Sequence, residues 1–254
     1  MNSQERIFFV LRQGVKIFEF LNFCSPFLRA LYSGDMTEED THAVLSNLAY
    51  VENQEERQNL ATEFGWTVDP ELSDINATLF YNHQLEKAIL AFRGTNIKNR
   101  DDLAIDSDIA FGKRDHTRFN EAVQRTEKAA GKYKDLNLTG HSLGGTLALH
   151  AYEKLGTPTR VYNPGASIKG DTLKLHSRGN PEIIRHKDDQ VSSGLSKYAT
   201  KTHTSVPWEL QDLVVDLFGN KIAQKAHHQY RVHSLDQFIS KDSQKKLKQK
   251  KGHR

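Results

Sequence analysis

The stretch that decides the fold is Leu136-Asn137-Leu138-Thr139-Gly140-His141-Ser142-Leu143-Gly144-Gly145. Its first residues predict a short strand, and the Leu- and Ala-rich residues 144–155 predict a helix directly afterwards. The Gly-x-Ser-x-Gly pattern between them places Ser142 on a tight turn from strand to helix. A serine hydroxyl is a weak nucleophile, so such a turn, within reach of a general base, is typical of nucleophilic catalysis.

Outward from this turn, the chain alternates strand and helix patterns. Strands are predicted over 77–81, 88–93, 161–162 and 183–184, and helices over 119–133 and 208–218. This alternation predicts an α/β fold with a mostly parallel sheet flanked by helices. The polar residues after 77–81 predict that it forms a hairpin or an adjacent pair with 88–93. Residues 1–70 read as a helical lead-in. Apolar residues from Phe8 to Leu21 recur at the spacing of an amphipathic helix, which Ser25-Pro26 breaks before a short second piece over 27–32.

Length and composition favour one domain over residues 1–240. A chain of 254 residues and 28.9 kDa can bury a core of its own without disulfides. The single Cys24 excludes an intramolecular disulfide and a cysteine-built zinc site, which mildly favours a reducing compartment. Charged residues interrupt the apolar segment 7–31, so neither a signal peptide nor a membrane span is expected there. A cytoplasmic or membrane-peripheral location is therefore favoured.

The last residues of the chain differ in composition from the rest. Residues 241–254 contain seven Lys or Arg and one acid, Asp242. With almost no apolar side chains to bury, this basic tail is expected to be disordered. A solvated tail is the simplest interpretation, and a transient contact with an anionic membrane surface is the sharper one. No nucleic-acid partner is expected.

A second signal lies where the predicted strand 88–93 ends, in Arg93-Gly94-Thr95. An enzyme that transfers acyl groups needs two hydrogen-bond donors aimed at the developing oxyanion. The backbone N–H of Leu143 is one candidate, because Leu143 follows Ser142. The backbone N–H of Thr95 is the other.

Four motifs together resemble the class 3 (fungal-type) lipases over residues 75–240. They are Phe92-Arg93-Gly94-Thr95, Asp101-Asp102-Leu103 with Asp106, Gly140-His141-Ser142-Leu143-Gly144-Gly145, and Tyr162-Asn163-Pro164-Gly165-Ala166. The resemblance implies an α/β-hydrolase fold and a Ser-Asp-His triad in that chain order. It further implies hydrolysis of lipid carboxylic esters through an acyl-enzyme, as in a triacylglycerol lipase or phospholipase, with no cofactor and no metal.

The resemblance also indicates which acid completes the triad. The family places it in an Asp-x-Val setting after a strand, and Asp189-Gln190-Val191 follows the predicted strand 183–184. Asp189 is therefore the predicted acid, with the neighbouring Asp188 as its alternative.

The base is predicted among three histidines within seven residues: His227, His228 and His233. In the family, this histidine opens a helix that carries apolar residues one turn later. His233 fits best, because Leu235 and Phe238 follow it at helical spacing, and His227 and His228 stay as alternatives. Paired histidines can also bind metal, but no carboxylate or cysteine accompanies them at a useful spacing.

Other functions remain open at this point. A thioesterase or acyltransferase would use the same residues on a different substrate. A lipase-like scaffold without catalysis, binding through its basic tail, is an alternative of another class. Retention of Ser142, Asp189 and a usable histidine favours an enzyme whose partner is a lipid ester.

Overall fold

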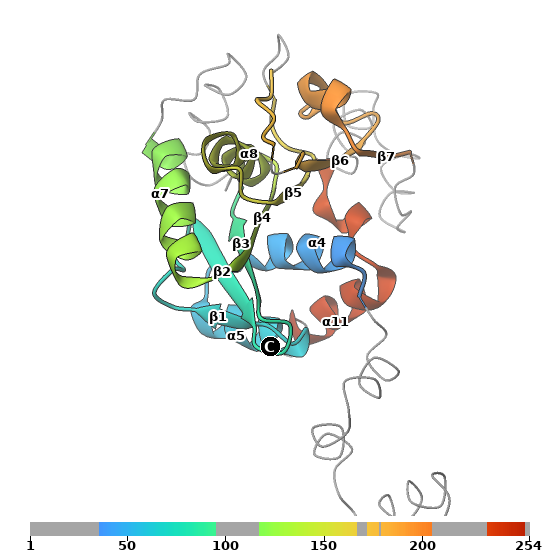
Figure 1. Ribbon diagram of the computed structural model, residues 1–254. Helices are drawn as coiled ribbons and strands as arrows, with labels where there is room; N and C mark the ends of the chain where they lie inside the picture. Colours follow the sequence, from blue (N-terminus) through green and yellow to red (C-terminus); the bar gives the residue numbers. More distant parts are fainter. Residues whose placement is uncertain (1–35, 95–116, 167–171, 178, 205–232, 252–254) are drawn as a thin grey trace, which may run out of the picture. The chain divides into compact units, whose positions relative to one another are not determined.

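The computed structural model describes residues 36–94, 117–166, 172–177, 179–204 and 233–251 (Figure 1). The chain divides into two compact units, residues 1–38 and 39–254, and the sheet belongs to the second unit. The helices predicted over 8–21, 27–32 and 208–218 lie outside the described residues.

Among the described residues, seven strands form one mixed sheet in chain order. They are β1 (Thr67–Asp69), β2 (Ala77–Asn82), β3 (Lys87–Phe92), β4 (Asp135–His141), β5 (Thr159–Tyr162), β6 (Glu182–His186) and β7 (Lys201–His203). The pairs β1–β2 and β2–β3 are antiparallel, whereas the strands from β3 to β7 run parallel. The predicted α/β fold with a mostly parallel sheet flanked by helices is therefore confirmed.

One face of the sheet packs against two helices, α7 (Thr117–Lys132) and α8 (Leu143–Leu155). Leu79, Leu90 and Leu138 lie opposite one another across β2, β3 and β4, and all three are fully buried. They share one hydrophobic core with the apolar side chains of both helices. Because α8 begins where β4 ends and returns across this core, Ser142 lies at the edge where the parallel strands end.

The opposite face is covered by α4 (Glu38–Leu48), which Figure 1 shows across the sheet from α7 and α8. Successive side chains of a strand point to opposite faces, so Thr139 faces away from the core around Leu138. The hydroxyls of Ser46 on α4 and Thr139 on β4 lie 2.9 Å apart. The sheet is thus covered on both faces, which explains the nearly continuous apolar runs of its central strands.

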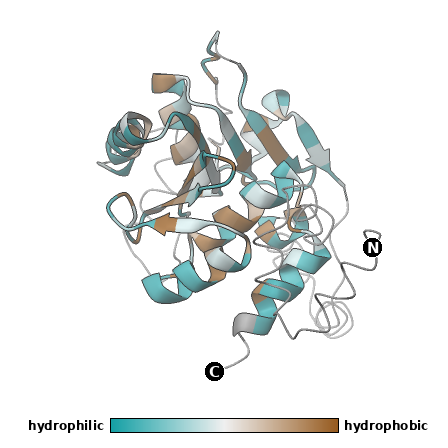
Figure 2. Cartoon of the chain, turned by 60° about the horizontal axis from the view of Figure 1, so that its bottom comes forward, coloured by the Kyte–Doolittle hydropathy of each residue, from teal (hydrophilic) through white to brown (hydrophobic). Residues whose placement is uncertain are grey.

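Composition predicts a disordered tail over 241–254, whereas residues 241–251 are helical in the structure. Residues Lys241–Lys251 form a helix, α11, which is largely hydrophilic in Figure 2. The carboxylate of Asp40 on α4 accepts hydrogen bonds from Ser240 N (2.6 Å), Ser240 Oγ (3.0 Å) and Ser243 Oγ (2.7 Å). Leu247 is only 6% exposed. These anchors come from residues about 200 positions away in the chain, so composition alone could not reveal them.

Three further elements lack a sequence signal of their own: helix α5 (Gln54–Glu63), which lies within the predicted helical lead-in 1–70, and the edge strands β1 and β7. The prediction of a helical lead-in up to residue 70 is wrong at its end, because Thr67–Asp69 form β1. The helix is mostly polar and is held at its start by Asn53, whose side chain accepts from Glu56 N (2.9 Å). The two edge strands have three residues each. Apolar periodicity cannot identify elements that are so short or so polar.

Candidate active site

The turn that carries Ser142 has a strained backbone. Ser142 has φ 56° and ψ −127°, a backbone conformation that residues other than glycine rarely adopt. A Cβ atom at Gly140 would lie 2.4 Å from the Gly144 carbonyl oxygen, and one at Gly144 would lie 2.1 Å from the Phe92 carbonyl oxygen. Both glycines are therefore needed for the close approach of β3, β4 and α8 around Ser142, as the Gly-x-Ser-x-Gly motif predicts.

Three predicted site residues meet at this turn. His233 Nε2 lies 2.8 Å from Ser142 Oγ, and His233 Nδ1 lies 3.0 Å from Asp189 Oδ1. Asp189 follows β6, and His233 lies two residues before the 3₁₀ helix η2 (Leu235–Phe238). The imidazole thus spans the hydroxyl and the carboxylate, although 44 residues separate it from the acid and 91 from the serine.

The surroundings of Asp189 favour its ionised form. Burial by itself raises the pKa of Asp189, but the hydrogen bond and charge of His233, together with hydrogen bonds from Ser192 and Val191, lower this pKa overall. An ionised carboxylate only accepts hydrogen bonds, so His233 Nδ1 carries the proton in the neutral ring. The lone pair of Nε2 then faces Ser142 Oγ, which is the arrangement a general base needs.

The alternative acid, Asp188, has a different environment. Its side chain is 46% exposed, and one of its carboxylate oxygens lies 4.0 Å from His186 Nδ1. The carboxylate paired with His233 is that of Asp189.

The short helix after His233 matches the reason for choosing this histidine. Ser234 is the N-cap of η2, and its hydroxyl accepts a hydrogen bond from Asp236 N (3.2 Å). Leu235 and Phe238 are both buried and anchor the helix on the body of the protein. The other two candidate bases, His227 and His228, lie outside the described residues.

Of the two predicted oxyanion donors, Leu143 lies within the described residues. Leu143 is the first residue of α8, and the first N–H groups of a helix have no partner within it. Thr95 lies outside the described residues, but Gly94 before it contacts the serine turn. A Cβ atom on Gly94 would lie 2.7 Å from the His141 carbonyl oxygen. The end of β3 therefore runs directly beside the residue that precedes Ser142.

A family model described as a Tle-like phospholipase domain matches residues 30–232. The chain belongs to this family. The match covers most of the chain, includes Ser142 and Asp189, and ends one residue before His233. A search of curated proteins finds no match.

Membership in the Tle-like phospholipase domain family supports the broad prediction of a lipase- or phospholipase-like protein that hydrolyses lipid esters. Among the described residues, no helix is long and apolar enough to cross a membrane.

The 162–166 motif entered the sequence analysis only as part of the lipase resemblance, with no site role predicted for its residues, and the structure shows that it links the parts of the site. Gly165 N donates to the Ser142 carbonyl oxygen (3.1 Å), and Ala166 N donates to the Val191 carbonyl oxygen (3.0 Å). Asn163 is fully buried with a left-handed φ of 40°. Asparagine adopts this conformation more readily than most residues. An asparagine directly after the apolar strand β5 was the sequence signal that could have identified Asn163 as a site residue.

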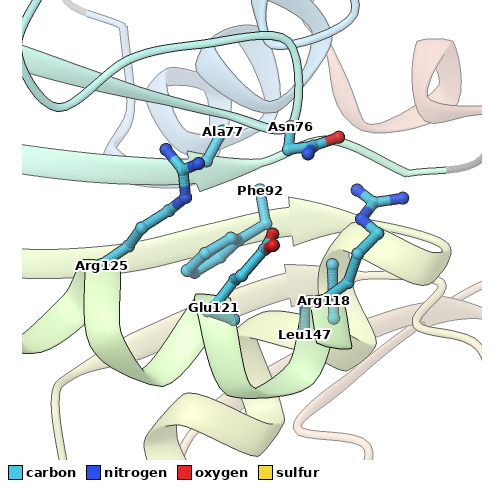
Figure 3. Close-up of a pocket in the computed structure, with 8 residues that line it drawn as sticks. Asn76, Ala77, Phe92, Arg118, Glu121, Arg125 and Leu147 are labelled. Atoms are coloured by element: carbon cyan, nitrogen blue, oxygen red, sulfur yellow. The ribbon is translucent and has the colours of Figure 1, made fainter. Parts of the chain in front are cut away.

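A small cavity of about 10 Å³ lies where β3 ends. Its walls are formed by Asn76, Ala77, Phe92, Arg118, Glu121, Ala122, Arg125 and Leu147 (Figure 3). Figure 3 shows the Glu121 carboxylate between the side chains of Arg118 and Arg125. Arg118 donates to the Arg93 carbonyl oxygen (3.0 Å), and Arg125 pairs with Asp74. The volume suits about one water molecule, so this cavity is too small for an acyl chain.

Proposed function

We propose that this protein is a serine hydrolase that cleaves carboxylic esters of phospholipids. Ser142 is the nucleophile, His233 the general base, and Asp189 the acid that orients the base. The observation that carries the proposal is the position of His233, 2.8 Å from Ser142 Oγ and 3.0 Å from Asp189 Oδ1. The family match supports a phospholipid rather than another ester, and the motifs that resemble class 3 lipases support the same chemistry.

The reaction has two halves. Ser142 Oγ attacks the ester carbonyl carbon while its proton moves to His233 Nε2, and Asp189 stabilises the imidazolium that forms. The bond to the leaving alcohol then breaks as His233 returns the proton to it, which leaves an acyl-enzyme. Water then attacks the acyl-enzyme carbonyl carbon as His233 takes one of its protons. The bond between this carbon and Ser142 Oγ breaks as His233 returns the proton to Oγ, which releases the fatty acid and restores Ser142. The N–H groups of Leu143 and Thr95 bind the oxyanion in both halves.

A phospholipid substrate is presented by a membrane surface, and α11 offers basic side chains that can contact such a surface. Lys241, Lys245, Lys246 and Lys248 are exposed along this helix, with the Lys245 side chain 73% exposed. Each lysine near an anionic membrane contributes about 1 kcal/mol of attraction. We therefore place the transient membrane contact on an ordered helix rather than on a flexible tail.

The test compares Ser142→Ala with Ser196→Ala, a control at an exposed serine of the 3₁₀ helix η1 (Ser193–Tyr198). Both variants and the wild type are assayed for fatty-acid release from phospholipid vesicles and for labelling by a fluorophosphonate. Ser142→Ala should lose at least about a thousandfold in kcat and all labelling, while Ser196→Ala keeps both.

The same assays separate the alternatives. Wild-type labelling with turnover of thioesters or triacylglycerol, but not of phospholipids, would replace the proposed substrate and keep the triad. An unlabelled wild type without activity on any ester would favour a scaffold and overturn the proposal.

A further inference from the structure

We infer that His141, Tyr50 and Asn163 are positioning residues, which hold the backbone carbonyl of His233 and thereby fix the catalytic base between Ser142 and Asp189. This inference rests on the proposed function and extends it to residues that do not touch the reacting atoms.

Two buried side chains meet the carbonyl oxygen of His233. His141 Nε2 lies 2.6 Å from this oxygen, and Asn163 Nδ2 donates to it over 3.1 Å. The rings of His141 and His233 also pack together, with centroids 4.9 Å apart and planes tilted by 42°. His141 directly precedes Ser142, so the base is tied through one side chain to the turn that carries its own nucleophile.

The protonation state of His141 follows from its partners. A carbonyl oxygen only accepts hydrogen bonds, so His141 Nε2 must carry a proton. Burial and, secondarily, the nearby charge of His233 lower the pKa of His141 to about 3, so the ring is neutral near pH 7. In a neutral ring, Nδ1 is then the acceptor. The Tyr50 hydroxyl lies 3.1 Å from Nδ1 and 3.3 Å from the His141 carbonyl oxygen, so both of these acceptors are within reach of its proton.

Tyr50 therefore supports the His141 ring at Nδ1, while Nε2 of the same ring meets the His233 carbonyl oxygen. Without the Tyr50 hydroxyl, Nδ1 would lose this hydrogen bond, and the ring would be less firmly held against the His233 carbonyl oxygen. Loss of a hydroxyl that contacts neither Ser142 nor Asp189 would then displace the base.

Asn163 connects the base to the acid. Its Oδ1 accepts a hydrogen bond from His186 N (2.8 Å), three residues before Asp189. Because this oxygen faces a backbone N–H, the amide nitrogen must point the other way, toward His233. One side chain thus sets the distance between the strand that leads to the acid and the residue that acts as base. The base must lie within hydrogen-bond reach of both partners, so a displacement of about 1 Å costs roughly a hundredfold in rate.

The test uses His141→Phe, which keeps an aromatic ring but removes the donor, and His141→Gln, which restores a side-chain N–H near the position of Nε2. Tyr50→Phe removes the hydroxyl beside His141 Nδ1 with little change in volume. His150→Phe on α8 is the matched control, because it makes the same substitution at a ring that packs on Phe119. The measurements are the phosphonylation rate of Ser142, kcat and KM on a soluble ester, and the low-field proton NMR signal of the His233–Asp189 hydrogen bond.

We expect His141→Phe to lower the phosphonylation rate and kcat about a hundredfold with KM nearly unchanged, and to shift or broaden the low-field signal. His141→Gln should recover most of the rate and the signal. Tyr50→Phe should lose about fivefold to tenfold, as expected for one hydrogen bond, and it tests the inference even if His141→Phe does not fold. His150→Phe should match the wild type.

Two results overturn the inference in distinguishable ways. If the wild type is phosphonylated at Ser142 while His141→Phe and Tyr50→Phe react equally fast with an unchanged low-field signal, the positioning role fails and the proposed function stands. If the wild type is not phosphonylated, the proposed function itself fails.

Discussion

Replacing Asp189 by Asn is the sharpest single test of the catalytic assignment, because every acceptor site of its carboxylate is occupied. Oδ1 accepts hydrogen bonds from His233 Nδ1 (3.0 Å) and Val191 N (3.2 Å). Oδ2 accepts from Ser192 N (3.0 Å) and from Ser192 Oγ (2.5 Å). Each oxygen therefore faces one backbone N–H, which cannot become an acceptor.

The amide introduced by Asp189→Asn would have to turn its NH₂ group toward one of these two pairs. Facing Ser192, it would meet the backbone N–H and lose a buried hydrogen bond. Facing His233, it would lose the bond to Val191 and donate to Nδ1, which moves the imidazole proton to Nε2. A protonated Nε2 cannot accept the proton of Ser142, so the variant must sacrifice either stability or catalysis.

The longer of the two backbone hydrogen bonds is the one to Val191, so the orientation toward His233 is expected to prevail. We then expect kcat to fall about 10⁴-fold, as for the equivalent substitution in serine proteases, which corresponds to about 5.4 kcal/mol in the barrier. The loss of one charge-assisted buried hydrogen bond should lower the free energy of unfolding by about 1–3 kcal/mol.

The assay is kcat/KM on a soluble short-chain ester, with urea unfolding followed in parallel. Asp188→Asn is the control, since its exposed carboxylate is not the one paired with His233, and it should lose less than about threefold. A value of kcat for Asp189→Asn within about tenfold of the wild type, in a folded protein, would refute the reasoning.

Three further predictions concern Gly144, the pH dependence of the stability that Asp189 contributes, and the lysines of α11. Gly144→Ala should lower the free energy of unfolding by about 3 kcal/mol, measured by urea denaturation, because its Cβ would press on the Phe92 backbone, which cannot move aside. Asp189 has a folded-state pKa below its unfolded value, so its contribution to stability is present above about pH 4 and lost as the pH falls through the folded pKa. The difference in unfolding free energy between wild type and Asp189→Asn should accordingly shrink on acidification, and a constant difference from pH 7 to pH 3 would contradict this. Lys245→Gln combined with Lys248→Gln should weaken cosedimentation with anionic vesicles at low salt but not turnover of a soluble ester, and equal binding at low salt would remove the membrane role of α11.

Much of the fold was predictable because its signals are local. The central strands β2 to β6 are short apolar runs, and α7 and α8 have helical spacing, so side-chain burial and element type follow from the same pattern. The tight turn at Ser142 was predictable for a related reason, since only glycine fits at positions 140 and 144. By contrast, α5 is polar, and β1 and β7 have only three residues each. These elements form because they contact neighbouring elements, which a local sequence pattern does not reveal.

The sequence by itself determined the α/β class, the turn that presents Ser142, and a short set of acids and histidines that could complete the site. The first two follow from residue spacing over a few positions, whereas the set of acids and histidines is what the resemblance to class 3 lipases implies. Only the tertiary structure decided that His233 reaches both Ser142 and Asp189, that Asn163 and His141 hold its carbonyl, and that Asp40 anchors the basic α11 as a helix. The contact between His233 and Asp189 joins residues 44 positions apart in the chain, and the other contacts join residues 70 to 203 positions apart. No local pattern encodes such distances, because they arise only when the sheet and its helices pack.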